Sequence, residues 1–157
     1  LVRMEFRSSL DGYWADAARA LTMGPADEVQ IERYEQLKKI KEEMLNSLQP
    51  GVTGSEVAEC IETLCERNGF ALYSQAGYGH GIGVSPVEPP FLDLSDETEL
   101  EEGMVLVLTP TLLGPKGELL RSFDTVVVEY DGARVIGMYR DWSKPYEAVS
   151  SYQHGGG

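Results

Sequence analysis

The chain is poor in histidine, cysteine and positive charge, and each shortage narrows its possible functions. It has two histidines, two cysteines, and 13 Lys and Arg against 26 Asp and Glu, which gives a net charge of −13. This negative balance disfavours sequence-independent binding to nucleic acid or to an anionic membrane surface, since both need clustered Lys and Arg. We therefore expect no nucleic-acid partner and no membrane partner.

Long apolar runs and a secretory leader are also missing. No run approaches the roughly 18 residues of a membrane span, and no charged segment precedes an apolar one and a cleavage site. The expected location is therefore cytoplasmic. Cys60 and Cys65 lie five residues apart, a spacing typical of neither a zinc knuckle nor a redox pair, so we expect two buried, reduced thiols.

The size of the chain favours a single domain. Its 157 residues, 42% of them hydrophobic, suffice for one core and are few for two. We expect the domain to span residues 1–148 and to end in a flexible tail, 149–157, with three terminal glycines. Because the chain has no initiator Met and begins directly in an alternating apolar segment, we expect it to be part of a longer protein.

The N-terminal segment is typical of a β-hairpin. Residues 1–6 and 13–21 are the predicted strands, and the turn between them, 8–12, contains Asp11-Gly12, which favours a tight reversal. Further strands are predicted at 104–108, 125–130 and 134–138, where glycine and proline mark the turns.

Two helices are predicted between the hairpin and these strands. The first starts near Pro25 and carries an apolar stripe that ends before Pro50. The second begins with Thr53 and Glu56 at capping-box spacing and ends at Gly69. This order of hairpin, helices and strands predicts an α+β fold.

His80 is the one histidine inside the predicted domain, since His154 lies in the tail. Glycines flank it in the segment 77–83, which lets the backbone pass close to a ligand and exposes one polar ring. A hydrogen-bonded core histidine in a tight turn explains the same pattern equally well.

Glu5 and Asp16 fall on the two arms of the predicted hairpin. Carboxylates on adjacent strands can point to one face and share a cation or a proton, although two ordinary surface acids are the commoner outcome. The acidic stretch 96–102 predicts a solvated loop, with a docking site for a basic partner as the alternative.

Several blocks together resemble the signature of the creatinase, aminopeptidase P, prolidase and methionine aminopeptidase family. They are Tyr13-Trp14-Ala15-Asp16-Ala17-Ala18-Arg19, Gly79-His80-Gly81-Ile82-Gly83, Val87-Glu88-Pro89-Pro90, Leu100-Glu101-Glu102-Gly103-Met104-Val105 and Arg121-Ser122-Phe123-Asp124-Thr125. The resemblance implies a pita-bread fold, a curved and mostly antiparallel sheet covered by helices. By the same resemblance, we expect the first half to be incomplete and to lack the first helix pair of the family.

Active peptidases of this family bind two divalent ions through two aspartates, one histidine and two glutamates. By resemblance, Glu5 stands at the first aspartate, and Asp16 and His80 are retained. Thr109 and Phe123 stand at the two glutamates, which removes two carboxylates from the implied site.

A second histidine of the family, which contacts substrate, is Val87 here. We therefore expect no dinuclear metal site and no cofactor. A single, weakly held divalent ion on Glu5, Asp16 and His80 is the alternative.

The resemblance then implies a metal-independent, non-peptidase protein that binds or hydrolyses a small amide or peptide-like ligand. His80 would carry the proton, with Glu5 or Asp16 orienting its ring. Arg19 or Arg121 would hold a ligand carboxylate, unless they are structural ion-pair partners. We also expect the ligand pocket to include the substituted positions Val87, Thr109 and Phe123.

Two other functions compete with this one, a non-catalytic peptide- or protein-binding module and a metal-dependent Xaa-Pro aminopeptidase or dipeptidase. In each case the hairpin, residues 1–23, would leave apolar sheet surface uncovered. We expect a homo-oligomer or a partner segment to cover it.

Overall fold

The computed structural model of this protein describes residues 2–75, 77–114, 117–136 and 145–148, and its fold belongs to the expected α+β class. In chain order the elements are β1 (Val2–Leu10), β2 (Tyr13–Met23), α1 (Glu28–Ser47), α2 (Gly54–Asn68), β3 (Gly79–Gly81), β4 (Glu88–Phe91), β5 (Val105–Leu108), β6 (Thr111–Leu113), β7 (Leu119–Arg121), β8 (Asp124–Glu129), β9 (Gly132–Val135) and β10 (Tyr146–Ala148).

The predicted hairpin is confirmed, with a shorter turn than expected. β1 and β2 pair antiparallel from Val2 opposite Leu21 to Leu10 opposite Tyr13. The turn is only Asp11-Gly12, whose φ angles of 52° and 88° are both left-handed, as a two-residue hairpin turn of this type requires. The prediction of a turn from residue 8 was therefore wrong, because residues 8–10 continue the strand. β10 then pairs with β2 in parallel.

Both predicted helices are confirmed together with their signals. Asp27 caps α1 in a reciprocal arrangement with Gln30, so the helix begins slightly later than Pro25 suggested. Thr53 and Glu56 form the predicted capping box of α2, and Gly69 ends that helix with a left-handed φ of 66°.

The main sheet has five strands in the order β4-β3-β5-β8-β9, and all its pairings are antiparallel. The predicted strands at 104–108 and 125–130 correspond to β5 and β8. The third prediction, 134–138, overlaps β9, which ends at Val135, and its last two residues lie outside the described part of the chain. β6 and β7 form a separate two-stranded pair.

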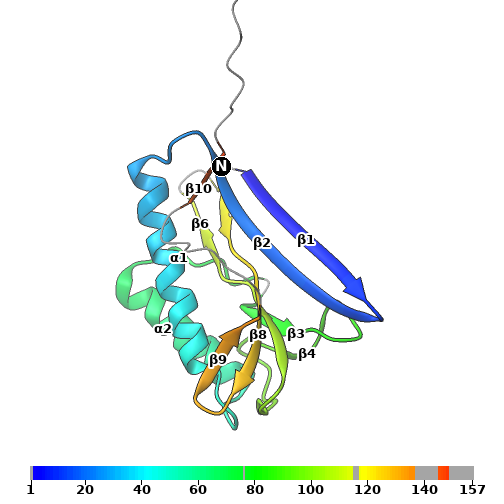
Figure 1. The fold of residues 1–157 in the computed structure, drawn as a ribbon. Helices are drawn as coiled ribbons and strands as arrows, with labels where there is room; N and C mark the ends of the chain where they lie inside the picture. Colours follow the sequence, from blue (N-terminus) through cyan, green and yellow to red (C-terminus); the bar gives the residue numbers. More distant parts are fainter. Residues whose placement is uncertain (1, 76, 115–116, 137–144, 149–157) are drawn as a thin grey trace, which may run out of the picture.

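Helices and hairpin lie on opposite sides of β8 (Figure 1). Alternate β8 side chains point to opposite faces, so Val126 and Val128 join the large core cluster beneath α1 and α2. Phe123, just before β8, belongs instead to a small cluster on the hairpin side with Ala18, Ile82 and Val107. The sheet therefore separates two apolar regions, and the hairpin covers the smaller one.

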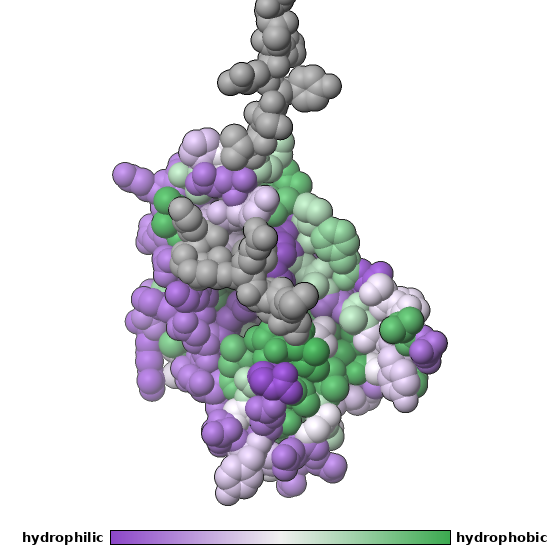
Figure 2. All heavy atoms as spheres, in the orientation of Figure 1, coloured by the Kyte–Doolittle hydropathy of each residue, from purple (hydrophilic) through white to green (hydrophobic). Residues whose placement is uncertain are grey.

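The surface differs between elements. The outer side of α1 is hydrophilic, whereas a hydrophobic area lies over β8 and β9 (Figure 2). β1 exposes a row of alternate apolar side chains, namely Val2, Met4, Phe6 and Leu10. Within the described residues, neither helix combines the length and apolar character that a membrane crossing needs.

Two local predictions have mixed outcomes. Both cysteines are free thiols, but Cys65 alone is buried, and Cys60 is partly exposed at the surface of α2.

The acidic stretch 96–102 is mostly exposed, as expected of a solvated loop. Asp96 is an exception, because its carboxylate accepts hydrogen bonds from the backbone N–H groups of Phe91 and Thr98.

Candidate functional site between hairpin and sheet

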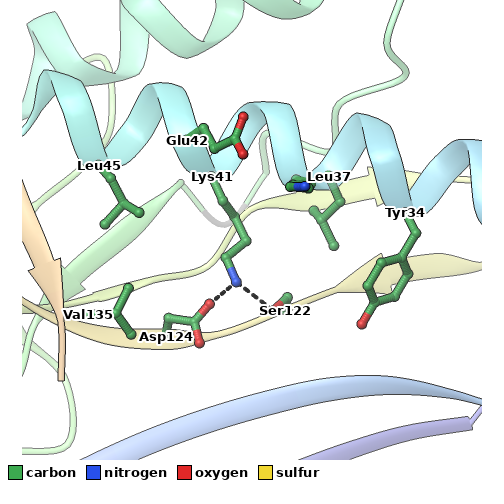
Figure 3. Close-up of a pocket in the computed structure, with 9 residues that line it drawn as sticks. Tyr34, Leu37, Lys41, Glu42, Leu45, Ser122, Asp124 and Val135 are labelled. Carbon is green, nitrogen blue, oxygen red and sulfur yellow. Dashed lines mark hydrogen bonds and ion pairs between the residues drawn. The ribbon is translucent and has the colours of Figure 1, made fainter. Parts of the chain in front are cut away.

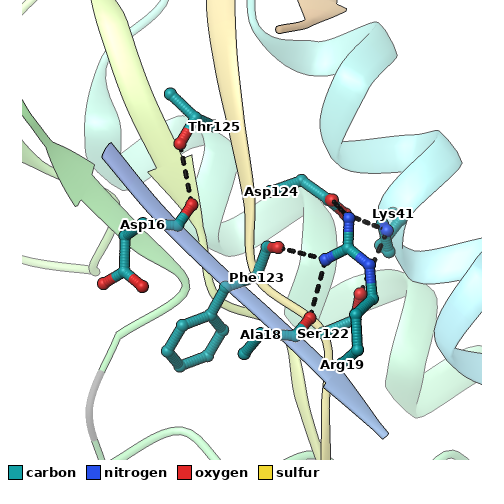
Figure 4. Close-up of polar contacts among 8 residues, drawn as sticks. All are labelled: Asp16, Ala18, Arg19, Lys41, Ser122, Phe123, Asp124 and Thr125. Atoms are coloured by element: carbon teal, nitrogen blue, oxygen red, sulfur yellow. Dashed lines mark hydrogen bonds and ion pairs between the residues drawn. The ribbon is translucent and has the colours of Figure 1, made fainter. Parts of the chain in front are cut away.

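Main-chain hydrogen bonds fix the hairpin on the sheet. Ala18 and Phe123 exchange both of their backbone hydrogen bonds, with N to O distances of 3.2 and 3.0 Å. Nearby, the Thr125 hydroxyl donates to the carbonyl oxygen of Asp16 at 2.8 Å (Figure 4). These contacts place the side chain of Asp16 at the join between hairpin and sheet.

The carboxylate of Asp16 is fully buried and is paired with Arg7. Arg7 donates to Asp16 Oδ2 from Nη2 at 2.6 Å and from Nε at 2.9 Å, and its own side chain is 39% exposed. The other oxygen of Asp16, Oδ1, is buried without a hydrogen-bond partner among the described residues. Arg7 is the counter-cation of the most buried acid in the site, and no motif of the sequence predicted this role.

Glu5 lies on the same face of the hairpin as Asp16, because Glu5 is opposite Ala18 and Arg7 is opposite Asp16 in the register. That part of the geometric prediction is confirmed. Glu5 is nevertheless exposed, and its ion-pair partner is the neighbouring Arg3, with Nε to Oε2 at 4.0 Å. Asp16 and Glu5 thus pair with separate arginines.

His80 lies in the middle of β3 and is half-buried. It is opposite Val107, which in turn is opposite Thr125, so the three side chains share the hairpin-facing side of the sheet. His80 Nδ1 is 2.9 Å from the carbonyl oxygen of Gly81. Because a carbonyl oxygen only accepts, Nδ1 carries the proton, and Nε2 is the proton-accepting atom of the neutral ring.

The glycines beside His80 serve a different purpose from the expected one. A Cβ atom on Gly79 would lie 2.6 Å from the carbonyl oxygen of Val107, and one on Gly81 would lie 2.4 Å from that of Pro89. The close approach that needs glycine is therefore to the neighbouring strands. Glycine spacing alone is thus no evidence of a ligand at His80.

The three positions expected to be substituted relative to the family have different environments. Phe123 is 7% exposed and packs in the apolar cluster between sheet and hairpin. Thr109 follows β5, is half-buried, and donates its backbone N–H to the carbonyl oxygen of Tyr78 at 2.8 Å. Val87 is 43% exposed in the loop before β4. Their proposed roles in ligand binding stay predictions.

Arg19 and Arg121, the two arginines expected to hold a ligand carboxylate, have different contacts. Arg19 is buried and donates to the carbonyl oxygens of Ala18 and Phe123 and, at 2.5 Å, to Asp124 Oδ1. Lys41 pairs with the other oxygen of Asp124 (Figure 4). This geometry favours the structural alternative for Arg19 over a ligand contact. Arg121 is half-buried, and its guanidinium carbon lies 6.0 Å from the centre of the Phe123 ring.

Burial alone would raise the pKa of Asp124, but the charges and hydrogen bonds of Lys41 and Arg19 outweigh it and hold that pKa below its ordinary value. Asp124 is therefore ionised in the folded protein at neutral pH.

Across the described part of the chain, no group of three or more His, Cys, Asp or Glu side chains is placed to hold a metal ion.

Solved structures with the same architecture define the fold as pita-bread. The X-Pro aminopeptidase from Thermotoga maritima superposes with a TM-score of 0.82 at 20% identity, over 92% of this chain and 40% of that one. The methionine aminopeptidase from the same organism superposes with a TM-score of 0.70 at 21% identity, over 85% of this chain and 61% of that one.

Residues 1–130 match the metallopeptidase family M24, and the chain belongs to this family. An Xaa-Pro dipeptidase from Pyrococcus furiosus is 30% identical over 134 residues, which are 85% of this chain and 38% of the relative. The Pyrococcus horikoshii Xaa-Pro dipeptidase is 29% identical over the same shares. The chain thus spans about 38% of the length of these curated relatives and is an Xaa-Pro dipeptidase-like domain.

Proposed function

We propose that this domain, as part of the whole protein, binds or hydrolyses a small amide or peptide-like ligand without a bound metal ion. The observation that carries the proposal is the ion pair of Asp16 with Arg7. A buried carboxylate needs a compensating cation, and in this domain a side chain supplies it.

The neighbouring positions support the same proposal. Two closely spaced divalent ions need several carboxylates around them. Phe123 contributes an apolar ring that packs into the cluster, and Glu5 is exposed and paired with Arg3. These residues do not fit a dinuclear metal centre, so we route no step of the chemistry through a metal.

The proposed chemistry rests on two side chains. In hydrolysis, His80 Nε2 accepts a proton from water as the water oxygen bonds to the carbonyl carbon of the ligand. It returns that proton to the leaving nitrogen as the C–N bond breaks, and so acts first as a general base and then as a general acid. The exposed side of the Arg7 guanidinium offers its remaining N–H groups to a ligand carbonyl or carboxylate.

A second candidate is metal-dependent Xaa-Pro dipeptidase or aminopeptidase activity, favoured by membership of family M24 and by the names of the relatives. Its test is release of the N-terminal residue from an Xaa-Pro dipeptide with added manganese. Activity that requires the metal and is abolished by His80→Ala would establish this candidate and replace the first.

Two further parts of the proposal concern the binding partners and the cellular location of the protein. The exposed apolar side chains of β1 support a second copy or a partner segment that covers the hairpin. We also propose a cytoplasmic location, and the net charge of −13 supports the absence of nucleic-acid and anionic-membrane partners.

The first experiment is elemental analysis of the purified protein before and after incubation with manganese, cobalt or zinc, followed by desalting. The proposal expects far less than one ion per chain in both samples. Retention of about two ions per chain would overturn the proposal, because that is the stoichiometry of the dinuclear peptidase site.

A second experiment is a titration with an Xaa-Pro dipeptide, monitored by NMR. The ligand should shift the His80 signals without added metal, and absence of binding would count against the proposal.

A further inference from the structure

A pocket of about 250 Å³ lies on the helix-facing side of the sheet, between α1, β8 and β9 (Figure 3). Its lining comprises Tyr34, Leu37, Lys38, Lys41, Glu42, Leu45, Ser122, Asp124 and Val135. Ser122 and Asp124 alternate with Phe123, so the pocket and the hairpin-facing site lie on opposite faces of the sheet. The pocket is therefore separate from the site proposed above.

The polar atoms of the pocket present hydrogen-bond donors. Lys41 Nζ donates to Ser122 Oγ at 3.2 Å and pairs with Asp124, which leaves one of its three N–H groups. Since the Ser122 oxygen accepts from Lys41, its hydroxyl proton is available for another acceptor. Figure 3 shows the side chains of Lys41 and Tyr34 extending from α1 toward the strand segment that carries Ser122.

Tyr34 adds a third donor. Its side chain is 5% exposed, and its hydroxyl has no hydrogen-bond partner among the described residues. Burial raises the pKa of Tyr34, so the hydroxyl stays protonated at neutral pH and can donate to an acceptor in the pocket. Three donors around one pocket favour a ligand that accepts several hydrogen bonds.

The local charge points to an anion. Lys38 and Lys41 line the pocket together with the carboxylates of Asp124 and Glu42, so the lining charges cancel. Arg19, which lies outside the lining, also pairs with Asp124, and the cluster with Arg19 included carries one net positive charge in a chain whose net charge is −13. The remaining lining is apolar and consists of Leu37, Leu45 and Val135 together with the Tyr34 ring.

We propose that this pocket binds a small hydrophobic monocarboxylate. The carboxylate accepts hydrogen bonds from Lys41, Ser122 and Tyr34. Its apolar part packs against Leu37, Leu45 and Val135. This inference goes beyond the proposed function, because it concerns a second site on the other face of the sheet.

Calorimetric titration of the full chain with 3-phenylpropanoate tests the proposal, with the neutral alcohol 3-phenylpropan-1-ol as the matched ligand. The expected result is binding of the acid and at least about tenfold weaker binding of the alcohol, which forms no charge-assisted hydrogen bonds. Absence of binding, or equal binding of both ligands, would overturn the proposal.

Two variants locate the site. Lys41→Met should weaken binding of the acid about tenfold or more. Lys39→Met makes the same change at an exposed position of α1 and should leave the affinity unchanged. Leu45→Trp fills the pocket and leaves the ion pairs of Asp124 intact, so it should abolish binding even if Lys41→Met does not fold. Undiminished binding in folded Leu45→Trp would place the ligand elsewhere and refute the assignment.

Discussion

The guanidinium of Arg7 and the carboxylate of Asp16 face each other across the two strands of the hairpin, with both contacts made to Asp16 Oδ2. The carboxylate of Asp16 is fully buried, and the side chain of Arg7 reaches the surface. The pair therefore connects the buried join between hairpin and sheet with the solvent.

Replacing Arg7 should be far more costly than replacing Arg3. Arg7→Met leaves the buried charge of Asp16 without a partner and should lower the free energy of unfolding by about 3 kcal/mol. Arg3→Met removes a surface pair with an N to O distance of 4.0 Å. That change should cost less than about 1 kcal/mol. Urea unfolding of both variants measures the difference, and equal values would show that the Arg7 pair is unimportant.

Stability should fall in acid because of Asp124. Its pKa is below the ordinary value in the folded protein, so it contributes stability that is complete above its unfolded pKa of about 4 and is lost as the pH falls through the folded pKa. Asp124→Asn should therefore flatten the decline of unfolding free energy below about pH 4. Denaturant titrations at several pH values test this, and an unchanged slope would assign the acid sensitivity to other carboxylates.

The two thiols should differ in their reactivity. Burial raises the pKa of Cys65 to about 11, and little thiolate forms at neutral pH. Cys60 is partly exposed, although burial and its hydrogen bond to Glu43 also raise its pKa. Titration of the folded protein with a disulfide reagent should detect slow reaction of Cys60 alone. In denaturant, both thiols should react. Cys60→Ser should remove the native-state reaction, and fast labelling of Cys65 would contradict its burial.

The apolar face of β1 should promote association of the isolated chain. Phe6 is 59% exposed beside the exposed side chain of Met4. Sedimentation velocity should detect concentration-dependent association that Phe6→Lys weakens. Tyr130 is 83% exposed on the loop between β8 and β9, so Tyr130→Lys is a control with the same gain of charge. A monomer at all concentrations, or equal effects of both variants, would exclude the hairpin as the contact surface.

The fold was predictable where a local signal determines the backbone. Asp11-Gly12 marks the hairpin, Thr53 with Glu56 starts α2, and Gly69 ends it. The short strands β3, β6, β7 and β10 have three residues each, too few to display an alternating pattern. Their existence depends on partners that are distant in sequence, and sequence reasoning missed them together with β4.

The candidate site was also predictable only where a local sequence signal marks its residues. The family blocks located Asp16 and His80, but neither composition nor motif drew attention to Arg7. A usable signal exists in the hairpin itself. Counting outward from the two-residue turn at Asp11-Gly12 places Arg7 opposite Asp16 and Glu5 opposite Ala18, as the register has them. The burial of Arg19 against Asp124 gives no such signal, since it joins residues 105 positions apart.

The carboxylate of Asp124 joins three elements, because it holds Arg19 of β2 and Lys41 of α1 from the first position of β8. Each element therefore depends on the other two for charge compensation in the interior. Loss of β8 leaves Arg19 and Lys41 without their shared counter-ion, and loss of β2 or α1 removes one of the two cations that hold the buried carboxylate, so each loss raises the free energy of the partly open form. The hairpin, the first helix and the sheet should thus lose hydrogen-exchange protection together, as a single cooperative unit.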